Sequence, residues 1–194
     1  MHRVARENDR AFALLGQAYY GLKDYKSAVD NFDKALALNP NGLRKFYIYK
    51  GLANLALGNV DQAVDDLENA QQEDDKSFEV NLGLARAYFL QEKFGSAFVQ
   101  AEILTSLAET DEEIALALYW HALSQEKRGE LKAAVKDWQA LLKMDKDVMT
   151  PEMRTTAEEH LKAVVTPTNT PKPATPTATK KGGTVTPTTK SGTG

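Results

Sequence analysis

A short sequence pattern recurs four times along the chain at nearly constant spacing. In each copy a polar turn precedes an alanine, and an apolar residue follows that alanine directly. The anchoring alanines lie 35, 34 and 37 residues apart, at Ala28, Ala63, Ala97 and Ala134. Self-similarity at a fixed period of roughly 20–50 residues is typical of repeat proteins, in which each unit packs only against its neighbours. The period therefore favours a solenoid of stacked units.

The residues around each alanine follow the spacing of helices. In the first unit, apolar or small residues recur at i, i+3, i+4 and i+7, which is the stripe of one helical face. This stripe consists of Phe12, Leu15, Gly16 and Tyr19, and a facing stripe consists of Ala28, Phe32 and Ala35. One pair of helices cannot bury these stripes alone, so we expect the pairs to stack on one another.

The pattern resembles the tetratricopeptide repeat, a helix-turn-helix unit of about 34 residues. The first unit has the expected residue type at all eight signature positions: Phe12, Leu15, Gly16, Tyr19, Ala28, Phe32, Ala35 and Pro40. The resemblance covers residues 9–146 but weakens after the first unit. The second unit has Lys50 in place of the usual leucine and Asn54 in place of the usual tyrosine, and the fourth unit has His121 and Gln125 at those two positions.

The resemblance implies an all-α fold, namely a right-handed α-solenoid of four helix-turn-helix units. We expect an N-terminal lead-in at residues 1–8 and repeats at about 9–43, 44–77, 78–111 and 112–146. Thr150 and Pro151 are typical of the start of a helix, so a capping helix is expected at about 150–165. Asp24 and Asn59 are expected to cap second helices, and Thr110 begins a capping box. The first repeat shows no comparable cap.

The last 29 residues differ in composition from the rest. Residues 166–194 contain 11 Thr, five Pro and four Lys but no acidic residue. Such a segment cannot bury enough apolar surface to fold, so we expect a disordered linker. An O-glycosylated stalk or a set of Thr-Pro phosphorylation sites are the alternatives. Removing its four lysines from the total of 24 basic residues leaves 20 basic and 27 acidic residues in 1–165, a net charge of −7.

Several function classes find no support in these residues. An acidic body argues against nucleic-acid binding, cysteine is absent, and no uncharged apolar run reaches the roughly 18 residues of a membrane span. We interpret His121 as a core histidine with a hydrogen-bond partner and Glu158–His160 as a solvated face. We expect no catalytic residue, no metal site and no cofactor.

The absence of a visible secretory signal favours the cytoplasm, whereas the Thr/Pro tail resembles spacers of exported proteins, so the location stays open.

The resemblance implies a non-enzymatic protein-interaction module whose concave groove is lined by the first helices. Groove positions fall at offsets 2, 5, 9 and 12 of each unit, and nine of the twelve residues at the last three offsets are apolar or aromatic. Offset 2 is occupied by Arg10, Lys45, Glu79 and Leu116. The predicted partner-binding residues are Leu52, Leu55, Arg86, Phe89 and Tyr119. An apolar or aromatic peptide or an amphipathic helix is the expected partner, with Arg86 facing a carboxylate.

Alternatives to this interpretation come from the same residues. Offsets 5, 9 and 12 are also suited to packing between neighbouring first helices, in which case these residues belong to the core. A second hypothesis is that the chain is an assembly or accessory scaffold domain of a larger complex, for example one of the cell envelope. A third hypothesis is that the chain forms a homo-oligomer through the uncapped first repeat. The carboxylate clamp of chaperone-binding arrays is not matched, since Ala13, Gln17 and Tyr49 occupy its positions.

Overall fold

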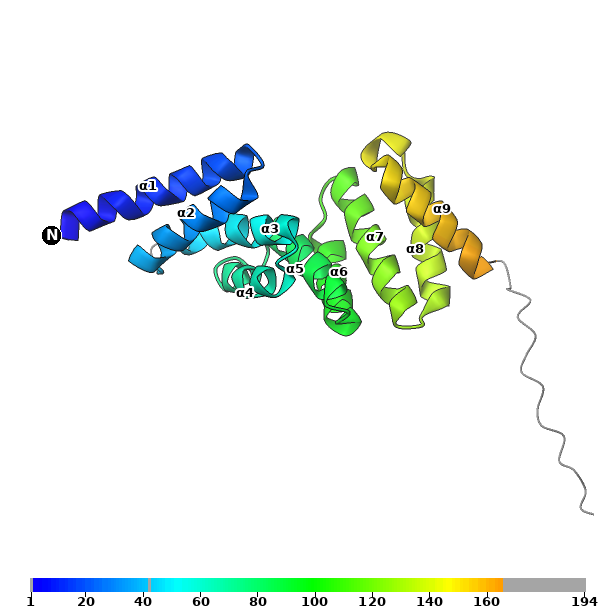
Figure 1. Ribbon diagram of the computed structural model, residues 1–194. Helices are drawn as coiled ribbons and strands as arrows, with labels where there is room; N and C mark the ends of the chain where they lie inside the picture. Colours follow the sequence, from blue (N-terminus) through cyan, green and yellow to red (C-terminus); the bar gives the residue numbers. More distant parts are fainter. Residues whose placement is uncertain (1, 42, 166–194) are drawn as a thin grey trace, which may run out of the picture.

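The computed structural model describes residues 2–41 and 43–165. Within these residues the chain forms nine α-helices and two short 3-10 helices, and it contains no strand. The elements are α1 (His2–Gly21), α2 (Tyr25–Leu38), η1 (Arg44–Phe46), α3 (Tyr47–Leu57), α4 (Val60–Gln71), α5 (Phe78–Leu90), α6 (Phe94–Leu107), α7 (Asp111–Lys127), α8 (Leu131–Lys143), η2 (Lys146–Val148) and α9 (Pro151–Val165). Figure 1 shows them following one another in chain order from the N-terminus to α9.

The helices pack as four successive pairs, α1 with α2, α3 with α4, α5 with α6 and α7 with α8, and α9 packs on α8. The first helices α1, α3, α5 and α7 also contact one another in succession, which places them side by side in one layer. This arrangement confirms the expected all-α solenoid of four helix pairs with a ninth helix at its C-terminal end (Figure 1). The Thr/Pro-rich segment 166–194 lies outside the described residues.

The expected helix starts are found, although one of them lacks the capping hydrogen bond. The Asp24 carboxylate accepts a hydrogen bond from the Ser27 N–H, and Thr110 forms the expected capping box at the start of α7. Thr150 accepts from the Met153 N–H at the start of α9. Asn59 occupies the expected N-cap position of α4, but its side chain makes no cap hydrogen bond and its amide donates to the Asn54 side chain instead.

The first helix begins earlier than the first repeat was expected to begin. Residues 2–8, which the sequence suggests as a lead-in, are helical and continuous with α1. As a result α1 has 20 residues, whereas α3, its counterpart in the second pair, has 11. The N-terminal part of α1 therefore extends beyond the helix that it pairs with (Figure 1).

Small residues allow the two helices of a pair to approach closely. A Cβ placed on Gly16 of α1 would lie 2.7 Å from a ring carbon of Phe32 on α2, and one placed on Gly51 of α3 would lie 2.7 Å from Leu67 of α4. Both distances are well inside van der Waals contact. The glycines are therefore required by the packing of the facing side chain on the partner helix, as the repeat pattern indicates.

Each pair contains a cluster of buried side chains, to which the next helix along the chain also contributes. Phe32 lies in the cluster of the first pair, Leu67 in that of the second and Leu104 in that of the third. Trp138 is fully buried in the last cluster, which α9 completes with Met153. The core is thus a row of neighbouring clusters, in keeping with the local contacts of a repeat fold.

We predict that Gly16→Ala lowers the free energy of unfolding by about 1–3 kcal/mol, because the new methyl group displaces the Phe32 ring. Gly95→Ala in α6 is the matched control, since a Cβ at that position meets no atom within 4 Å. This control is expected to be neutral or to stabilise the helix by up to roughly 1 kcal/mol. Urea unfolding followed by far-UV circular dichroism measures both. Equal stability of the two variants would contradict the described pairing of α1 and α2.

Candidate functional site

The inner surface is defined here as the groove positions of the four repeats, which lie on α1, on η1 with α3, on α5 and on α7. These positions are Arg10, Ala13, Gln17, Tyr20, Lys45, Ile48, Leu52, Leu55, Glu79, Leu82, Arg86, Phe89, Leu116, Tyr119, Leu123 and Glu126. Of the predicted partner-binding residues on it, Arg86 is exposed, and Leu52, Phe89 and Tyr119 are half-buried. Leu55 is only 9% exposed and belongs to the buried cluster of the second pair. Four of the five residues thus present accessible side-chain surface, whereas Leu55 packs between helices as the alternative interpretation states.

An aromatic cluster connects Phe89 with Tyr119. The Phe89 ring lies 5.7 Å from the Trp120 ring and 5.3 Å from the Phe94 ring, measured between centroids. Tyr119 contacts Trp120 at 5.4 Å and Trp138 at 5.7 Å, in both cases edge to face. Trp120 is therefore the link between α5 and α7, although the sequence reasoning did not select it. The only sequence signal for it is its place next to Tyr119.

A second aromatic cluster joins the first two pairs. Tyr20 contacts Tyr25 at 5.8 Å and Tyr49 at 5.6 Å. Burial raises the pKa of the Tyr20 hydroxyl above its ordinary value, and Tyr25 and Tyr49 add to the rise. The positive charge of Arg86 lowers the same pKa, so Arg86 of α5 lies within electrostatic reach of Tyr20 on α1. The charge of Arg86 thus acts on an aromatic side chain of the first repeat.

Glu126 occupies a groove position of the fourth repeat but already has partners. One carboxylate oxygen accepts from the Trp138 Nε1–H at 2.6 Å, and the other lies 2.5 Å from His160 Nδ1 on α9. The His160 ring also packs 5.5 Å from the Trp138 ring. The expected solvated face therefore holds for Glu158 and Glu159 but is wrong for His160, because that side chain, 35% exposed, contacts the Glu126 carboxylate of α7.

His121 is half-buried and has a carboxylate partner. Its Nδ1 lies 2.8 Å from an oxygen of Asp137, and its ring stacks on Phe98 of the preceding pair at 4.9 Å. The Arg128 guanidinium covers the same Phe98 ring at 3.9 Å. These contacts confirm the interpretation of His121 as a histidine with a hydrogen-bond partner.

The second repeat contains a buried polar network at the positions where it departs from the repeat pattern. Lys50 Nζ lies 2.8 Å from a carboxylate oxygen of Asp33 on α2 and 3.1 Å from one of Asp66 on α4. The Asn54 amide donates to the other oxygen of Asp66 at 2.8 Å, and the Asn54 carbonyl accepts from Asn59. The two unusual residues of α3 therefore serve a common partner, Asp66, which the sequence reasoning did not connect with them.

The charges of this network influence each other. Burial raises the pKa of the Asp66 carboxyl, and the neighbouring Lys50 and Asn54 offset only part of the rise. Burial alone would lower the pKa of Lys50, but its hydrogen bonds and charge interactions with Asp33 and Asp66 raise it above the ordinary value. Lys50 is thus held in its charged form and supports the negative charge of Asp66.

Neither a metal centre nor a membrane span is visible in the part of the chain that the structure describes. Within residues 2–41 and 43–165, no group of three or more His, Cys, Asp or Glu side chains is placed to hold a metal ion. Over the same ranges, no helix combines the length and the apolar character that crossing a membrane requires.

Comparison with protein families and curated proteins gives one consistent result. Family models of the tetratricopeptide repeat match residues 10–41, 50–103 and 116–147. DnaJ homolog subfamily C member 7 of Homo sapiens is 27% identical over 135 residues, which is 68% of this chain and 26% of that protein. The Mus musculus protein of the same name matches equally. The chain therefore spans about a quarter of the length of these relatives.

Solved structures share the fold at low sequence identity. The MamA protein superimposes with a TM-score of 0.66 at 17% identity, over 81% of each chain. A thermophilic TPR protein of Thermus thermophilus gives a TM-score of 0.59 at 19% identity, over 81% of this chain and 83% of the other. At these identities the likeness concerns the architecture alone.

We predict that Lys50→Met lowers the free energy of unfolding by about 3–5 kcal/mol at pH 7, because it leaves the Asp66 carboxylate buried without its cation. The loss should shrink at pH 5. A carboxyl whose folded-state pKa is raised favours folding once it is protonated, so the variant regains stability as the pH falls through that pKa. On the alkaline side, the stabilising effect of Lys50 in the unmodified chain is lost as the pH rises through its own raised pKa.

Asp33→Asn is the control for this prediction, because Asp33 is the exposed partner of Lys50 and its ion pair should contribute less than about 1 kcal/mol. Chemical unfolding at both pH values measures the three chains. An equal loss for Lys50→Met at pH 7 and pH 5 would show that the buried Asp66 charge is not its cause.

Proposed function

Because the chain belongs to the tetratricopeptide repeat family, we propose that this protein-interaction scaffold binds an apolar or aromatic segment of a partner protein on its inner surface. Leu52, Arg86, Phe89 and Tyr119 are the proposed contact residues. Leu55 supports the groove from beneath in this proposal, because it is buried. The proposed role is non-enzymatic.

The observation that carries the proposal is the combination of fixed aromatic rings with an exposed cation. Phe89 and Tyr119 are both held by Trp120 yet keep part of their surface accessible. Rings that are already held by neighbours lose little rotamer freedom on binding, so more of their contact energy remains available. Aromatic residues and arginine are also the types that dominate the energy of protein interfaces.

Peptide-library selection on the full chain tests the proposal. We expect enrichment of peptides with apolar or aromatic anchors, and a roughly 10–100-fold weaker affinity when Arg86→Glu and Phe89→Ala are combined. Val99→Ala is the control, because Val99 is an exposed apolar residue on the second helix α6. Circular dichroism verifies that all three chains are folded. Absence of any enriched peptide from the folded chain, or unchanged affinity of the double variant, would contradict the proposed groove.

Self-association is the second candidate, and a specific comparison favours it. The position of Leu15 in the first repeat corresponds to Lys50, Leu84 and His121 in the later ones. Leu84 is fully buried, and Lys50 and His121 contact the second helix of the preceding pair. Leu15 is 47% exposed, since no described helix pair lies against its outer side. An open face of this kind suits a second copy or another subunit of an assembly.

We predict that Leu15→Lys shifts a concentration-dependent association of the full chain toward the monomer. Leu57→Lys, at the end of α3, is the control, because Leu57 is exposed to a similar degree in another repeat. Analytical ultracentrifugation over a range of concentrations measures the effect. A chain that is monomeric throughout, or one that associates equally well with Leu15→Lys, would exclude this face as a homo-oligomer contact.

A further inference from the structure

A pocket of about 300 Å³ lies at the N-terminal end of the molecule, between α1 and η1. Its apolar lining is Leu14, Leu43 and Phe46, and its polar lining is Arg10 and Lys45. Leu43 and Phe46 are buried, whereas Leu14 is 61% exposed. The volume is at the lower limit of the roughly 300–1,000 Å³ found for small-molecule sites, so the pocket suits one or two side chains of a peptide.

Neither cation of the pocket is neutralised by a carboxylate whose side chain the structure describes. Among the described side chains, no carboxylate forms an ion pair with Arg10 or Lys45, although Lys45 Nζ lies over the Phe46 ring at 5.1 Å. The adjacent Arg44 is paired with Glu73 at 2.9 Å. Asp9 is buried, and its carboxylate accepts from the Arg10 backbone N–H and from the Asn39 side chain.

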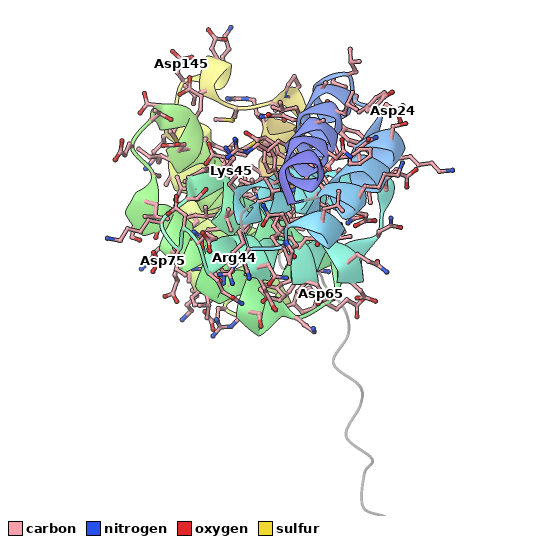
Figure 2. All side chains as sticks on the ribbon, turned by 90° about the vertical axis from the view of Figure 1, so that its left-hand side faces the viewer. Asp24, Arg44, Lys45, Asp65, Asp75 and Asp145 are labelled. Atoms are coloured by element: carbon pink, nitrogen blue, oxygen red, sulfur yellow. The ribbon has the colours of Figure 1, made fainter. Side chains whose placement is uncertain are left out.

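The two cations belong to a part of the chain that is acidic on balance. Residues 1–165 carry a net charge of −7, so two cations at one pocket are a local exception. Figure 2 shows Lys45 and Arg44 near the middle of the view onto the N-terminal end. A single anionic group would be attracted to the pocket by its two cations.

We propose that this pocket binds an acidic side chain, Asp or Glu, together with an adjacent apolar side chain of a partner peptide. Arg10 and Lys45 would form charge-assisted hydrogen bonds with the carboxylate. The apolar neighbour would lie on Leu14 and Phe46. This inference rests on the proposed function and adds a chemical requirement to it, because the pocket is separate from the residues around Arg86.

The chain's own C-terminal segment does not fit this site. Residues 166–194 contain four lysines and no acidic residue, so they offer no acidic side chain to Arg10 and Lys45. The corresponding groove positions of the third and fourth repeats are Glu79 and Leu116, which do not attract a carboxylate. The acidic part of the partner peptide is therefore assigned to the first two repeats.

Fluorescent peptide pools test the inference on the full chain. Each pool has randomised apolar positions around one fixed residue, which is Glu, Gln or phosphoserine. We expect the Glu pool to bind about tenfold or more tightly than the Gln pool, and added salt to reduce the difference. The preference should disappear in the double variant Arg10→Gln with Lys45→Gln. Both side chains lie on the surface, so the variant is expected to remain folded, and circular dichroism verifies this.

The control is Lys132→Gln with Lys136→Gln, which removes the same charge from exposed positions of α8. A Glu preference that survives in the first variant, or that falls equally in the control, would overturn the pocket as its source. Preference for the phosphoserine pool over the Glu pool would overturn the choice of a carboxylate. Pools that bind through Phe89 without any Glu preference would overturn this inference and leave the proposed function intact. Failure of every pool to bind would overturn both.

Discussion

The close approach of the two helices within each pair is the constraint on which the rest of the structure depends. Phe32 and Leu67 occupy the space that a Cβ on Gly16 or Gly51 would need. The distance between paired helices in turn determines where consecutive first helices meet, and therefore how far apart their outward side chains lie. Because every unit contacts only its neighbours, such a local distance is passed along the stack. The spacing of Leu52, Arg86 and Tyr119 is in this sense a product of the packing beneath them.

The second repeat shows how a departure from the repeat pattern is accommodated. Lys50 and Asn54 replace a leucine and a tyrosine, and both bind Asp66, while Lys50 also reaches Asp33. The network joins α2, α3 and α4, so it spans the junction between two repeats. A buried ion pair adds little stability over a well-packed apolar pair, but an unpaired buried carboxylate is costly. Separating α4 from α3 while Asp66 stays buried therefore costs more free energy than breaking an apolar contact would cost.

The repeat period and the helical spacing were sufficient to predict the solenoid, because both depend only on local sequence. The capping residues Asp24 and Thr110 could be predicted for the same reason. The sequence was less informative wherever two elements meet. Periodicity cannot separate a groove residue from one packed between first helices, which is why Leu55 was placed on the surface. The orientation of His160 depends on how α9 crosses α8, and the linking role of Trp120 depends on its distance from Phe89 in space.

The contact between α9 and Glu126 has a consequence for the charge of the inner surface. Two groove positions hold acidic residues, Glu79 and Glu126, and the second is engaged by Trp138 and by His160 of the capping helix. The capping helix thus covers a carboxylate as well as apolar surface. A helix at the end of a repeat array can thus change which charged groups of the groove remain accessible to a partner. A change in α9 would therefore alter the electrostatic field at the fourth repeat, which is the end of the inner surface farthest from the first repeat.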